Sequence, residues 1–514
     1  LFPEKGAIFW ELDVKRQVKN HIRWSGNNEI SLQEAQMRTF SNFAWMFLQT
    51  EGDYNFSSGS RGRGNLSSTA NPYFLFPQIY NFRYNIYSSE WPVANRAIEL
   101  YLQKKSENEG WERQINGLSN NEKANLLLEK HTFKELLADV EQRNLQNNIV
   151  GLEASRLFAR SEINMGVDAF RDSLYAMLKR NTFLNIKFEN MLDTLGEMSR
   201  TDLYSYLKEW EQLTPLPFYS IGEPELTKVV NKGGEEFFVL KVLVSNNSDY
   251  DGIIQMNVLQ NGWWYQPMED PRARKKVEIA AHTSKEFVSV WEEQIRDVEI
   301  NTMVSGNLPY MIRQSIGNVK QERNKIVKDT IYTLPESSLE MPGEVIVDNE
   351  DSTLFVLSTP AVVGLLPKWL DKVEDTSFKY SGISWWRAPL QWTATTNAKY
   401  YGKYIRSAYV IKSGDGSQTA TWKIPVPEAG QYELYYHVFK DDELRWNDRL
   451  QGEYHFRVAY DSEMEDAYIN LRKANEGWEQ LGTYYFSADT VRVVLTDECK
   501  LRSVTADAVK IVKR

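Results

Sequence analysis

The sequence predicts a multidomain α plus β protein, in which an N-terminal α-helical domain is followed by two antiparallel β-sandwich domains. Apolar residues of about the first 220 positions recur at intervals of three and four, as on one face of a helix. From about Glu223 onward, apolar and polar residues alternate, as in half-buried strands. The length of 514 residues fits about three domains. The changes in pattern place these domains at residues 1–222, 223–340 and 341–514.

The helical domain is expected to consist of short amphipathic helices. Ser31 followed by Glu34 fits a capping box, in which a hydroxyl and a carboxylate satisfy free amides at a helix start. The segment from Ser57 to Pro72 is rich in small polar residues and predicts a mobile surface loop. The proline-interrupted segment 214–220 ends the domain. Predicted helices after the loop cover residues 92–101, 119–128, 133–140, 149–163, 168–178 and 183–195, and a last one begins at Ser199 with Asp202 three residues on.

The two β domains are predicted from alternation and turn signals. Ile254, Met256 and Val258 alternate with polar residues, and Gly233-Gly234 is a turn signal between strands. These features favour an immunoglobulin-like sandwich at 223–340, ending in a polar linker from about residue 309 to 338. In the final domain the alternation is seen at 434–438, 454–460 and 491–495.

Charge and cysteine content exclude several classes of protein. The net charge of −10 argues against nucleic acid as a partner, because polyanion-binding proteins are usually basic. The single cysteine, Cys499, excludes an intramolecular disulfide. Its neighbours Asp497 and Glu498 would raise the pKa of its thiol, which disfavours a catalytic role. No apolar stretch reaches the length of about 18 residues that a membrane span needs. Since the chain begins at Leu1 without a secretion signal, we expect a mature form or an excised part of a longer protein.

The motifs of common enzymes are not found in the sequence. None of the five histidines begins an H-E-x-x-H motif, and no phosphate loop, G-x-S-x-G elbow or dinucleotide fingerprint occurs. We therefore predict no catalytic residue, no cofactor and no metal site, and favour a non-enzymatic protein. His437 and His455 are expected on strands of one sheet, facing away from the apolar stripe. Asp441, Asp442 and Glu443 could imitate a pair of glycosidase acids, but a solvated loop is the preferred interpretation.

Aromatic side chains provide the candidate ligand-binding residues. Phe, Trp and Tyr make up 13% of the chain, and such rings serve either β-sandwich cores or surfaces on which sugars stack. The sequence alone leaves both uses open, because the orientation of strand residues depends on register. The candidate ligand-binding residues are Trp385, Trp386, Trp392, Tyr400, Tyr401 and Trp446.

Residues 343–514 resemble the golvesin C-terminal or xanthan-lyase carbohydrate-binding-like domain of bacterial surface and secreted proteins. The resemblance depends on several separated stretches in the same order, including GEVIVDNED from Gly343, QTATWKIPVPEAGQYELYYHV from Gln418 and GWEQLGTYYFSADTVRVVLTDE from Gly477. The insertion LSTPAVVGLLPKWLDKV at 357–373 departs from the usual opening of that domain. The resemblance implies a jelly-roll-like sandwich and glycan binding, without a motif that assigns particular ligand residues.

Residues 76–220 resemble, more distantly, the helical part that follows the zinc motif in gluzincin aminopeptidases, especially the peptidase modules fused to bacterial ABC-type permeases. The stretches that support this are NNIVGLEASRLFARSEINMGVDAFRDSLYAML from Asn147 and SRTDLYSYLKEWEQLTPLPFYSI from Ser199. The zinc-binding motif and the glutamate-rich substrate site of that family do not occur in these 514 residues. The resemblance therefore implies a non-catalytic half or a degenerate relative.

Together these features predict a non-catalytic extracytoplasmic region of a larger bacterial envelope protein, in the periplasm or at the cell surface. Its expected partners are a polysaccharide or an envelope protein, and the membrane-anchored remainder of the same polypeptide. An alternative is the half of an aminopeptidase-like metallopeptidase that does not bind zinc, with its catalytic domain outside this chain. A weaker alternative is a polysaccharide-active enzyme that uses the acids at 441–443.

Overall fold

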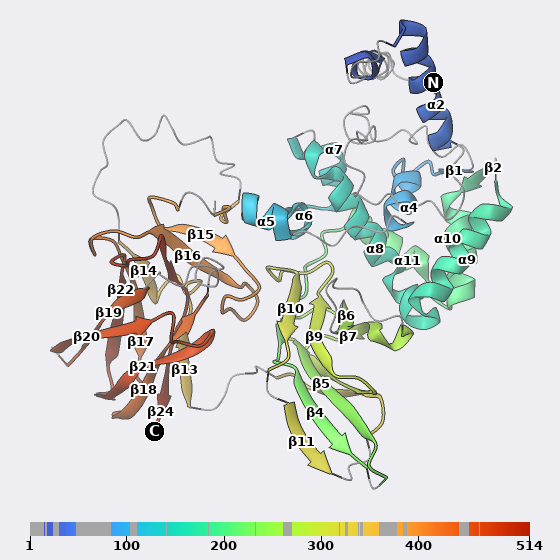
Figure 1. Cartoon of the computed structure of the whole chain (residues 1–514). Helices are drawn as coiled ribbons and strands as arrows, with labels where there is room; N and C mark the ends of the chain where they lie inside the picture. Colours follow the sequence, from blue (N-terminus) through green and yellow to red (C-terminus); the bar gives the residue numbers. More distant parts are fainter. Residues whose placement is uncertain are drawn as a thin grey trace. The chain divides into compact units, whose positions relative to one another are not determined.

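The computed structural model divides the chain into two compact units, each described here by itself (Figure 1). A helical unit comprises Leu1–Glu107 and Leu127–Thr214, and a β-rich unit comprises Asn108–Leu126 and Pro215–Arg514. Both β-sandwiches lie within the second unit. The division into two units does not test the three predicted domain boundaries, which stay a prediction. The structure describes residues 15, 18–23, 30–47, 84–102, 110–139, 141–182, 184–231, 233–260, 270–317, 319–323, 327–337, 339, 343–358, 378–383, 388–440, 452–461 and 463–514.

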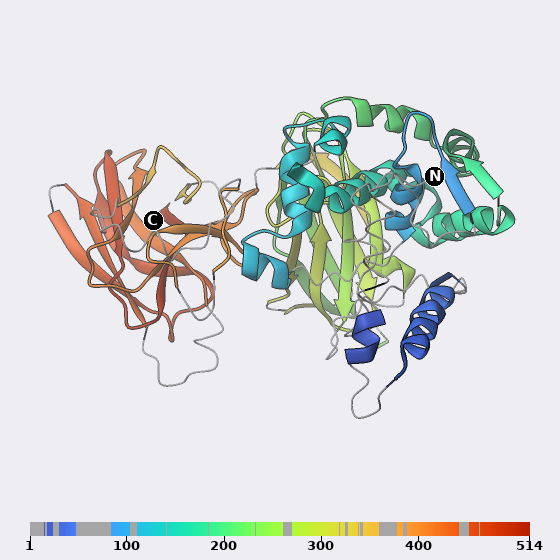
Figure 2. The same ribbon diagram turned by 90° about the horizontal axis from the view of Figure 1, so that it is seen from above.

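The helical unit is built around the long helix α8 (Gln146–Met165). Its buried face packs Phe158 against Tyr101 and Phe170, with ring centroids 4.8 and 5.5 Å away. A pair of short parallel strands lies beside the helices, as Figure 2 shows for the blue and green arrows of β1 and β2. The other elements are α2 (Leu32–Phe47), β1 (Tyr84–Tyr87), α4 (Ala94–Leu102), α7 (Phe133–Ala138), η2 (Glu141–Asn144), α9 (Val167–Arg180), β2 (Leu184–Lys187), α10 (Phe188–Ser199), α11 (Leu203–Lys208) and η3 (Glu209–Glu211).

Two details of the predicted helices need correction. Residues 184–187 form strand β2 rather than the start of a helix, because they pair in parallel with β1, and α10 begins only at Phe188. The last helix is capped by Asp202, whose carboxylate accepts the backbone N–H of Ser205 at 3.2 Å. Ser199 instead ends α10 and donates its hydroxyl to the carbonyl of Leu195. Half of the capping box predicted at Ser31 is confirmed, since its hydroxyl accepts the backbone N–H of Glu34. The carboxylate of Glu34 pairs with Arg38.

The first sandwich of the β-rich unit has a four-stranded sheet, in the order β10-β9-β6-β7, and a six-stranded sheet. The larger sheet follows the order β11-β4-β5-β8-β12, and β3 pairs with β5. As alternation predicted, Ile254, Met256 and Val258 are buried between the sheets. The strands are β3 (Tyr219–Ile221), β4 (Glu225–Val230), β5 (Glu236–Asn246), β6 (Gly252–Gln260), β7 (Arg274–Ile279), β8 (Thr283–Trp291), β9 (Ile295–Asn301), β10 (Met311–Ser315), β11 (Val319–Arg323) and β12 (Thr330–Pro335), with the short helix η4 (Pro271–Ala273).

The region predicted as a linker is instead part of this sandwich. Strands β10, β11 and β12 lie within residues 309–338 and form outer strands of its two sheets. Outer strands have one partner and are largely solvated, so their polar composition imitates that of a linker. The residue burial agrees, because β12 consists only of exposed and half-buried positions.

The C-terminal sandwich has a four-stranded sheet, in the order β13-β24-β18-β21, and a five-stranded sheet, β14-β17-β22-β19-β20. A third sheet has the order β15-β16-β23. The core contains Trp422, Tyr436 and Phe456, each with an exposed fraction of 0%. The strands are β13 (Glu344–Val347), β14 (Phe355–Leu357), β15 (Thr393–Thr396), β16 (Ser407–Lys412), β17 (Thr419–Pro425), β18 (Gly430–Val438), β19 (Glu453–Tyr460), β20 (Glu463–Asn470), β21 (Gly477–Phe486), β22 (Thr490–Thr496), β23 (Ser503–Ala506) and β24 (Val509–Lys513).

A helical hairpin, α5 (Gly110–Asn116) and α6 (Asn120–Leu128), belongs up to Leu126 to the β-rich unit, although the strands of that unit begin about 90 residues later in the sequence. Thr396 donates its hydroxyl to the carbonyl of Gly117 at 2.8 Å, and Asn121 donates to the hydroxyl of Tyr310 at 3.1 Å. Gly117 has a φ of +78°, and a Cβ there would lie 2.3 Å from the backbone of Ser381. The hairpin therefore contacts segments of both sandwiches.

The predicted fold class is confirmed, because a helical region is followed by several mainly antiparallel sheets. Two strand pairs, β1 with β2 and β4 with β11, are parallel.

Within the part of the chain that the structure describes, no helix is both long and apolar enough to cross a membrane.

Candidate functional site

The outer face of the sheet β13-β24-β18-β21 gathers aromatic side chains outside the core. In β18, Leu434, Tyr436 and Val438 are buried, so the intervening Tyr435 and His437 lie on the opposite face. Cross-strand register then extends this face, because His437 is paired with Trp478 of β21 and Tyr435 with Lys510 of β24. All four of these outer side chains are only half-buried.

Three of the rings form a compact group at one end of this face. Tyr401, from the loop before β16, has its ring centroid 5.0 Å from that of Trp478 and 5.8 Å from that of His437. His437 and Trp478 are 5.1 Å apart with an interplanar angle of 78°, an edge-to-face arrangement that aromatic quadrupoles favour. The group therefore has a defined shape.

Buried Asp507 holds two members of the group in place. Its carboxylate has an exposed fraction of 0%, lies 2.8 Å from Nδ1 of His437 and accepts the backbone N–H of Tyr401 at 3.1 Å. Its carbonyl accepts the indole N–H of Trp422 from the core at 3.2 Å. Burial raises the pKa of Asp507, and His437 partly offsets this effect. Since removing Asp507 would free both His437 and the Tyr401 loop, we regard it as the positioning residue of the group.

Lys510 extends the group toward Tyr435. Its ammonium lies 4.9 Å from the ring centroid of Trp478 and 5.3 Å from that of Tyr435, within the range of cation–π attraction. It also pairs with Glu344 of β13 at 2.9 Å. Tyr435 donates its hydroxyl to Glu433 at 2.6 Å, and this hydrogen bond is the largest cause that raises the pKa of Tyr435.

The same face continues along β18 and β21 to Tyr485. This residue is paired with Gln431 and has an exposed fraction of 62%. Gln431 and His437 are six positions apart along the strand, which corresponds to about 20 Å. We define the aromatic face as Tyr401, Tyr435, His437, Trp478 and Tyr485. It is long enough to contact several linked sugar rings or a short extended peptide.

The sequence-predicted ligand residues are only partly brought together. Tyr401 lies in the aromatic face, whereas Tyr400 has an exposed fraction of 6% and packs on Phe439 with ring centroids 4.7 Å apart. Trp392 packs against the core of the sandwich, and its buried indole N–H has no hydrogen-bond partner. Trp385, Trp386 and Trp446 lie outside the described residues, as do the acids at 441–443 and the loop from Ser57 to Pro72.

Sequence reasoning missed Tyr435, Trp478, Tyr485 and Lys510. The alternation in β18 could have indicated Tyr435, because it is out of phase with the buried Leu434 and Tyr436. Trp478 and Lys510 become neighbours of Tyr435 only through the register of three strands, which the sequence does not specify.

The expectation that His437 and His455 lie on strands of one sheet is wrong. His437 lies on β18 of the four-stranded sheet, whereas His455 lies on β19 of the five-stranded sheet. His455 instead stacks on Tyr468 with ring centroids 4.9 Å apart and pairs with Asp466 at 2.8 Å. For Cys499, the predicted direction is confirmed, but desolvation by burial is the largest cause that raises its pKa.

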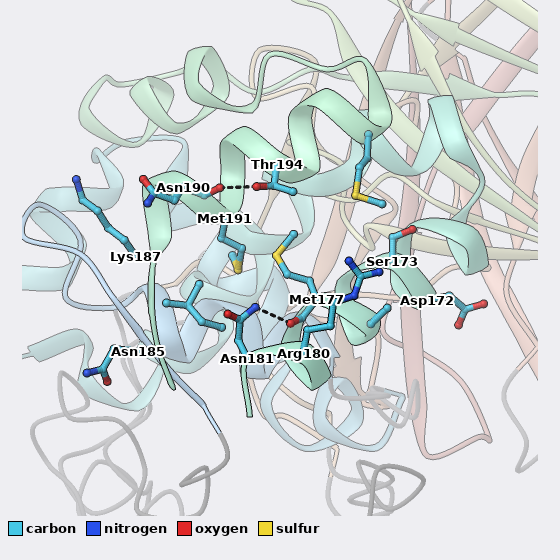
Figure 3. Close-up of a pocket in the computed structure, with 13 residues that line it drawn as sticks. Asp172, Ser173, Met177, Arg180, Asn181, Asn185, Lys187, Asn190, Met191 and Thr194 are labelled. Atoms are coloured by element: carbon cyan, nitrogen blue, oxygen red, sulfur yellow. Dashed lines mark hydrogen bonds between the residues drawn. The ribbon is translucent and has the colours of Figure 1, made fainter. Parts of the chain in front are cut away.

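The helical unit has a groove of about 590 Å³ between α9, β2 and α10 (Figure 3). Met177 and Met191 are directed toward one another in Figure 3. Met198 also lines the groove. Arg180 and Lys187 supply positive charge at the groove. Asp172 adds a negative charge, so the groove combines an adaptable apolar lining with charges of both signs.

The fold and the aromatic face define the C-terminal part of the chain as a β-sandwich with an exposed ring surface. Comparison with protein families agrees, because residues 386–513 match the model of the golvesin C-terminal domain. The resemblance inferred from the sequence is therefore confirmed for these residues. No curated protein matches the chain significantly.

Several solved structures are distantly similar. Paenibacillus xanthan lyase has 16% identity and a TM-score of 0.24, with 59% of this chain and 27% of that chain covered. Legionella pneumophila aminopeptidase A, solved with aspartic acid, has 13% identity and a TM-score of 0.21, with 44% and 23% covered. Bacteroides uniformis β-glucuronidase has 11% identity and a TM-score of 0.17, with 61% and 31% covered. The matched regions span under a third of these chains, and TM-scores this low carry no argument about function.

Proposed function

We propose that this chain is a non-catalytic, extracytoplasmic region of a larger bacterial envelope protein, and that it binds glycans through the aromatic face. The observation that carries the proposal is a group of partly buried rings, Tyr401, His437 and Trp478, two of which are held by a buried carboxylate, Asp507. Sugar rings present apolar C–H faces that stack on aromatic side chains. The match of residues 386–513 to the golvesin C-terminal domain supports a surface-associated role.

The geometry favours binding without reaction. Fixed rings lose little conformational entropy when a ligand is bound, which is the advantage of a preorganised site. The Lys510 ammonium lies over the rings of Trp478 and Tyr435, and Glu433 accepts the hydroxyl of Tyr435. Both charged groups can exchange hydrogen bonds with hydroxyl groups of a sugar. A partly exposed row of rings along two strands suits an extended polysaccharide better than a small molecule that needs enclosure.

Replacing Trp478 with alanine is expected to weaken glycan binding by at least about tenfold, equivalent to about 1.4 kcal/mol. The indole is the central ring of the group, with contacts to Tyr401 and His437. Isothermal titration calorimetry of the purified chain against a panel of bacterial and plant polysaccharides would measure the change. A ligand found in the panel should also raise the melting temperature, because it binds only the folded state.

The matched control is Tyr468→Ala, an exposed tyrosine on β20 of the other sheet in the same sandwich. It should bind as the unmodified protein does. Equal loss in both variants, or no binding to any polysaccharide, would contradict the proposal. A parallel assay with zinc and dipeptide substrates tests the aminopeptidase-like alternative, which turnover would support.

The cellular placement belongs to the same proposal. We place the chain in the periplasm or at the cell surface, joined to a membrane-anchored remainder of the same polypeptide that is linked to an ABC-type permease. Fractionation of cells that express the full-length gene, with an antibody against this chain, tests the placement. Recovery in the cytoplasmic fraction would overturn it.

A further inference from the structure

The outward side of strand β21 combines rings near its two ends with uncharged polar groups between them. Trp478 and Tyr485 are members of the aromatic face. Gln480 and Thr483 lie between them and pair with outward residues of β18. Both are exposed, and the amide of Gln480 donates to the hydroxyl of Thr483 at 3.1 Å. Amides and hydroxyls can both donate and accept hydrogen bonds, as sugar hydroxyls do, so this row suits a sugar chain without charge.

The cations of this sheet are each compensated by a carboxylate. Strands β13, β24, β18 and β21 contain no arginine and two lysines, Lys510 and Lys513, against three glutamates. Lys510 lies 2.9 Å from Glu344, and Lys513 lies 2.5 Å from Glu428. Arg514, which follows β24, lies 3.1 Å from the carboxylate of a glutamate in β18. These four strands, all of whose residues the structure describes, therefore offer no unpaired lysine or arginine to a carboxylated sugar.

We propose that the aromatic face selects neutral polysaccharides and discriminates against acidic ones. This inference rests on the proposed function, because it names the class of glycan for the same face. An ionised carboxylate that approaches the rings loses part of its hydration, and a cation is the partner that best offsets this cost. The net charge of −10 of the chain adds a long-range repulsion of polyanions. A neutral sugar avoids both penalties and keeps its C–H contacts with the rings.

The ion pair of Lys510 and Glu344 is the element that sets this preference. The Lys510 ammonium lies over the rings of Trp478 and Tyr435. The side chains of Lys510 and Glu344 are only 13 and 17% exposed, so salt and solvent screen their attraction weakly. Without Glu344, the ammonium would stay beside the rings and could pair with a carboxylate of a bound sugar. Glu344 therefore determines specificity by neutralising the cation at the aromatic face.

Matched pairs of polysaccharides test the preference on the unmodified chain. The probes are glucomannan, laminarin and pullulan, each with a derivative whose primary hydroxyls are oxidised to carboxylates. We expect isothermal titration calorimetry to show binding of a neutral probe, and binding at least about tenfold weaker for its oxidised form. The affinity for the neutral probe should change by less than about twofold between about 50 and 500 mM NaCl, because salt screens only charged contacts.

The failure of this inference differs from the failure of the proposed function. Equal binding of both forms, or binding of the oxidised form alone, would overturn the preference and leave glycan binding intact. A panel in which no probe binds would overturn both.

Glu344→Gln tests the role of the ion pair. The variant leaves the Lys510 ammonium unpaired, so its affinity for the oxidised probe relative to the neutral one should rise by at least about tenfold. Glu428→Gln changes the net charge equally and is the matched control. Its partner Lys513 pairs across strands with the buried Tyr432 rather than with a member of the aromatic face, so this variant should gain nothing. No gain in Glu344→Gln, or an equal gain in both variants, would overturn the role of Glu344. If Glu344→Gln fails to fold, the comparison of neutral and oxidised probes on the unmodified chain decides by itself.

Discussion

Replacing Glu122 with alanine is expected to destabilise the β-rich unit by about 3–5 kcal/mol. Glu122 has an exposed side-chain fraction of 0% and lies 2.8 Å from the guanidinium of Arg113. Its carboxylate also accepts the backbone N–H of Ser119 at 2.7 Å, and the hydroxyl of Ser119 accepts the N–H of Glu122. Alanine would keep the bond from its own N–H to the Ser119 hydroxyl, but it would leave the Arg113 charge and the backbone N–H of Ser119 without the carboxylate, and both groups are largely buried.

The effect should spread beyond the hairpin because α5 and α6 contact both sandwiches. Leu118 is buried in one cluster with Leu308 and Tyr380, and Asn125 donates to the carbonyl of Met303 at 3.1 Å. The hairpin therefore contacts segments near residues 303–308 and near residue 380, which are distant from each other in sequence. We therefore expect the unfolding of the sandwiches to become less cooperative, with a lower m-value in urea.

The control for this prediction is an ion pair of the same type on the surface. Glu225 and Lys320 are 3.2 Å apart with exposed side-chain fractions of 57 and 63%, so Glu225→Ala should cost less than about 1 kcal/mol. A double variant, Arg113→Met with Glu122→Leu, should recover much of the loss, since replacing both partners of a buried pair with apolar groups removes the uncompensated charge. Urea unfolding followed by fluorescence measures all three. A Glu122→Ala midpoint equal to that of Glu225→Ala would contradict the argument.

The sequence predicts helices and strands that have a clear local pattern of apolar residues. It does not predict strands that are defined only by pairing with a strand far away in the sequence. The alternation at Val491, Val493 and Leu495 identifies a buried strand, because one face of β22 is in the core. The residues of β2 could not be identified in this way, since their pairing with β1 is about 100 residues away in sequence and only one of the four is buried. The same limit explains the outer strands β10 to β12, which resemble a linker in composition.

The candidate site is predictable to a similar extent. Periodicity indicates that Tyr435 and His437 face away from the core, and the chemistry of aromatic side chains suggests ligand contact. The contribution of Asp507 is not visible in the sequence, because an aspartate between two strands resembles a turn residue. Only the fold shows that it is fully buried and that the loop carrying Tyr401 is attached to it.

Replacing Asp507 with alanine is expected to destabilise the C-terminal sandwich by about 3 kcal/mol and to disorder the aromatic face. The substitution removes the partner of His437 Nδ1 and the acceptor for the backbone N–H of Tyr401. Asp507→Asn keeps an oxygen that can accept from Tyr401, so it should recover part of the loss. A folded Asp507→Asn variant should still bind any glycan that the unmodified protein binds, more weakly.

The two variants should also differ from the unmodified protein in their pH dependence. Burial raises the pKa of Asp507 in the folded state above its unfolded value of about 3.9. Between these two pKa values the folded state holds more protons than the unfolded state, so this group makes stability fall as pH rises through the window. Asp348, whose pKa is also raised well above its usual value by burial and by Asp507, contributes in the same direction.

Urea unfolding at a series of pH values measures this difference. The stability of the unmodified protein minus that of Asp507→Asn should increase as pH falls through the window, because only the unmodified protein gains from protonating Asp507. The contribution of Asp348 should shrink in the variant, since one of the causes that raise its pKa is removed. If the difference in stability between the two proteins stays constant with pH, the pKa of Asp507 is the same in the folded and the unfolded state, which would contradict the prediction. A difference that falls with decreasing pH would mean that His437 and the Tyr401 amide stabilise the carboxylate more than burial penalises it.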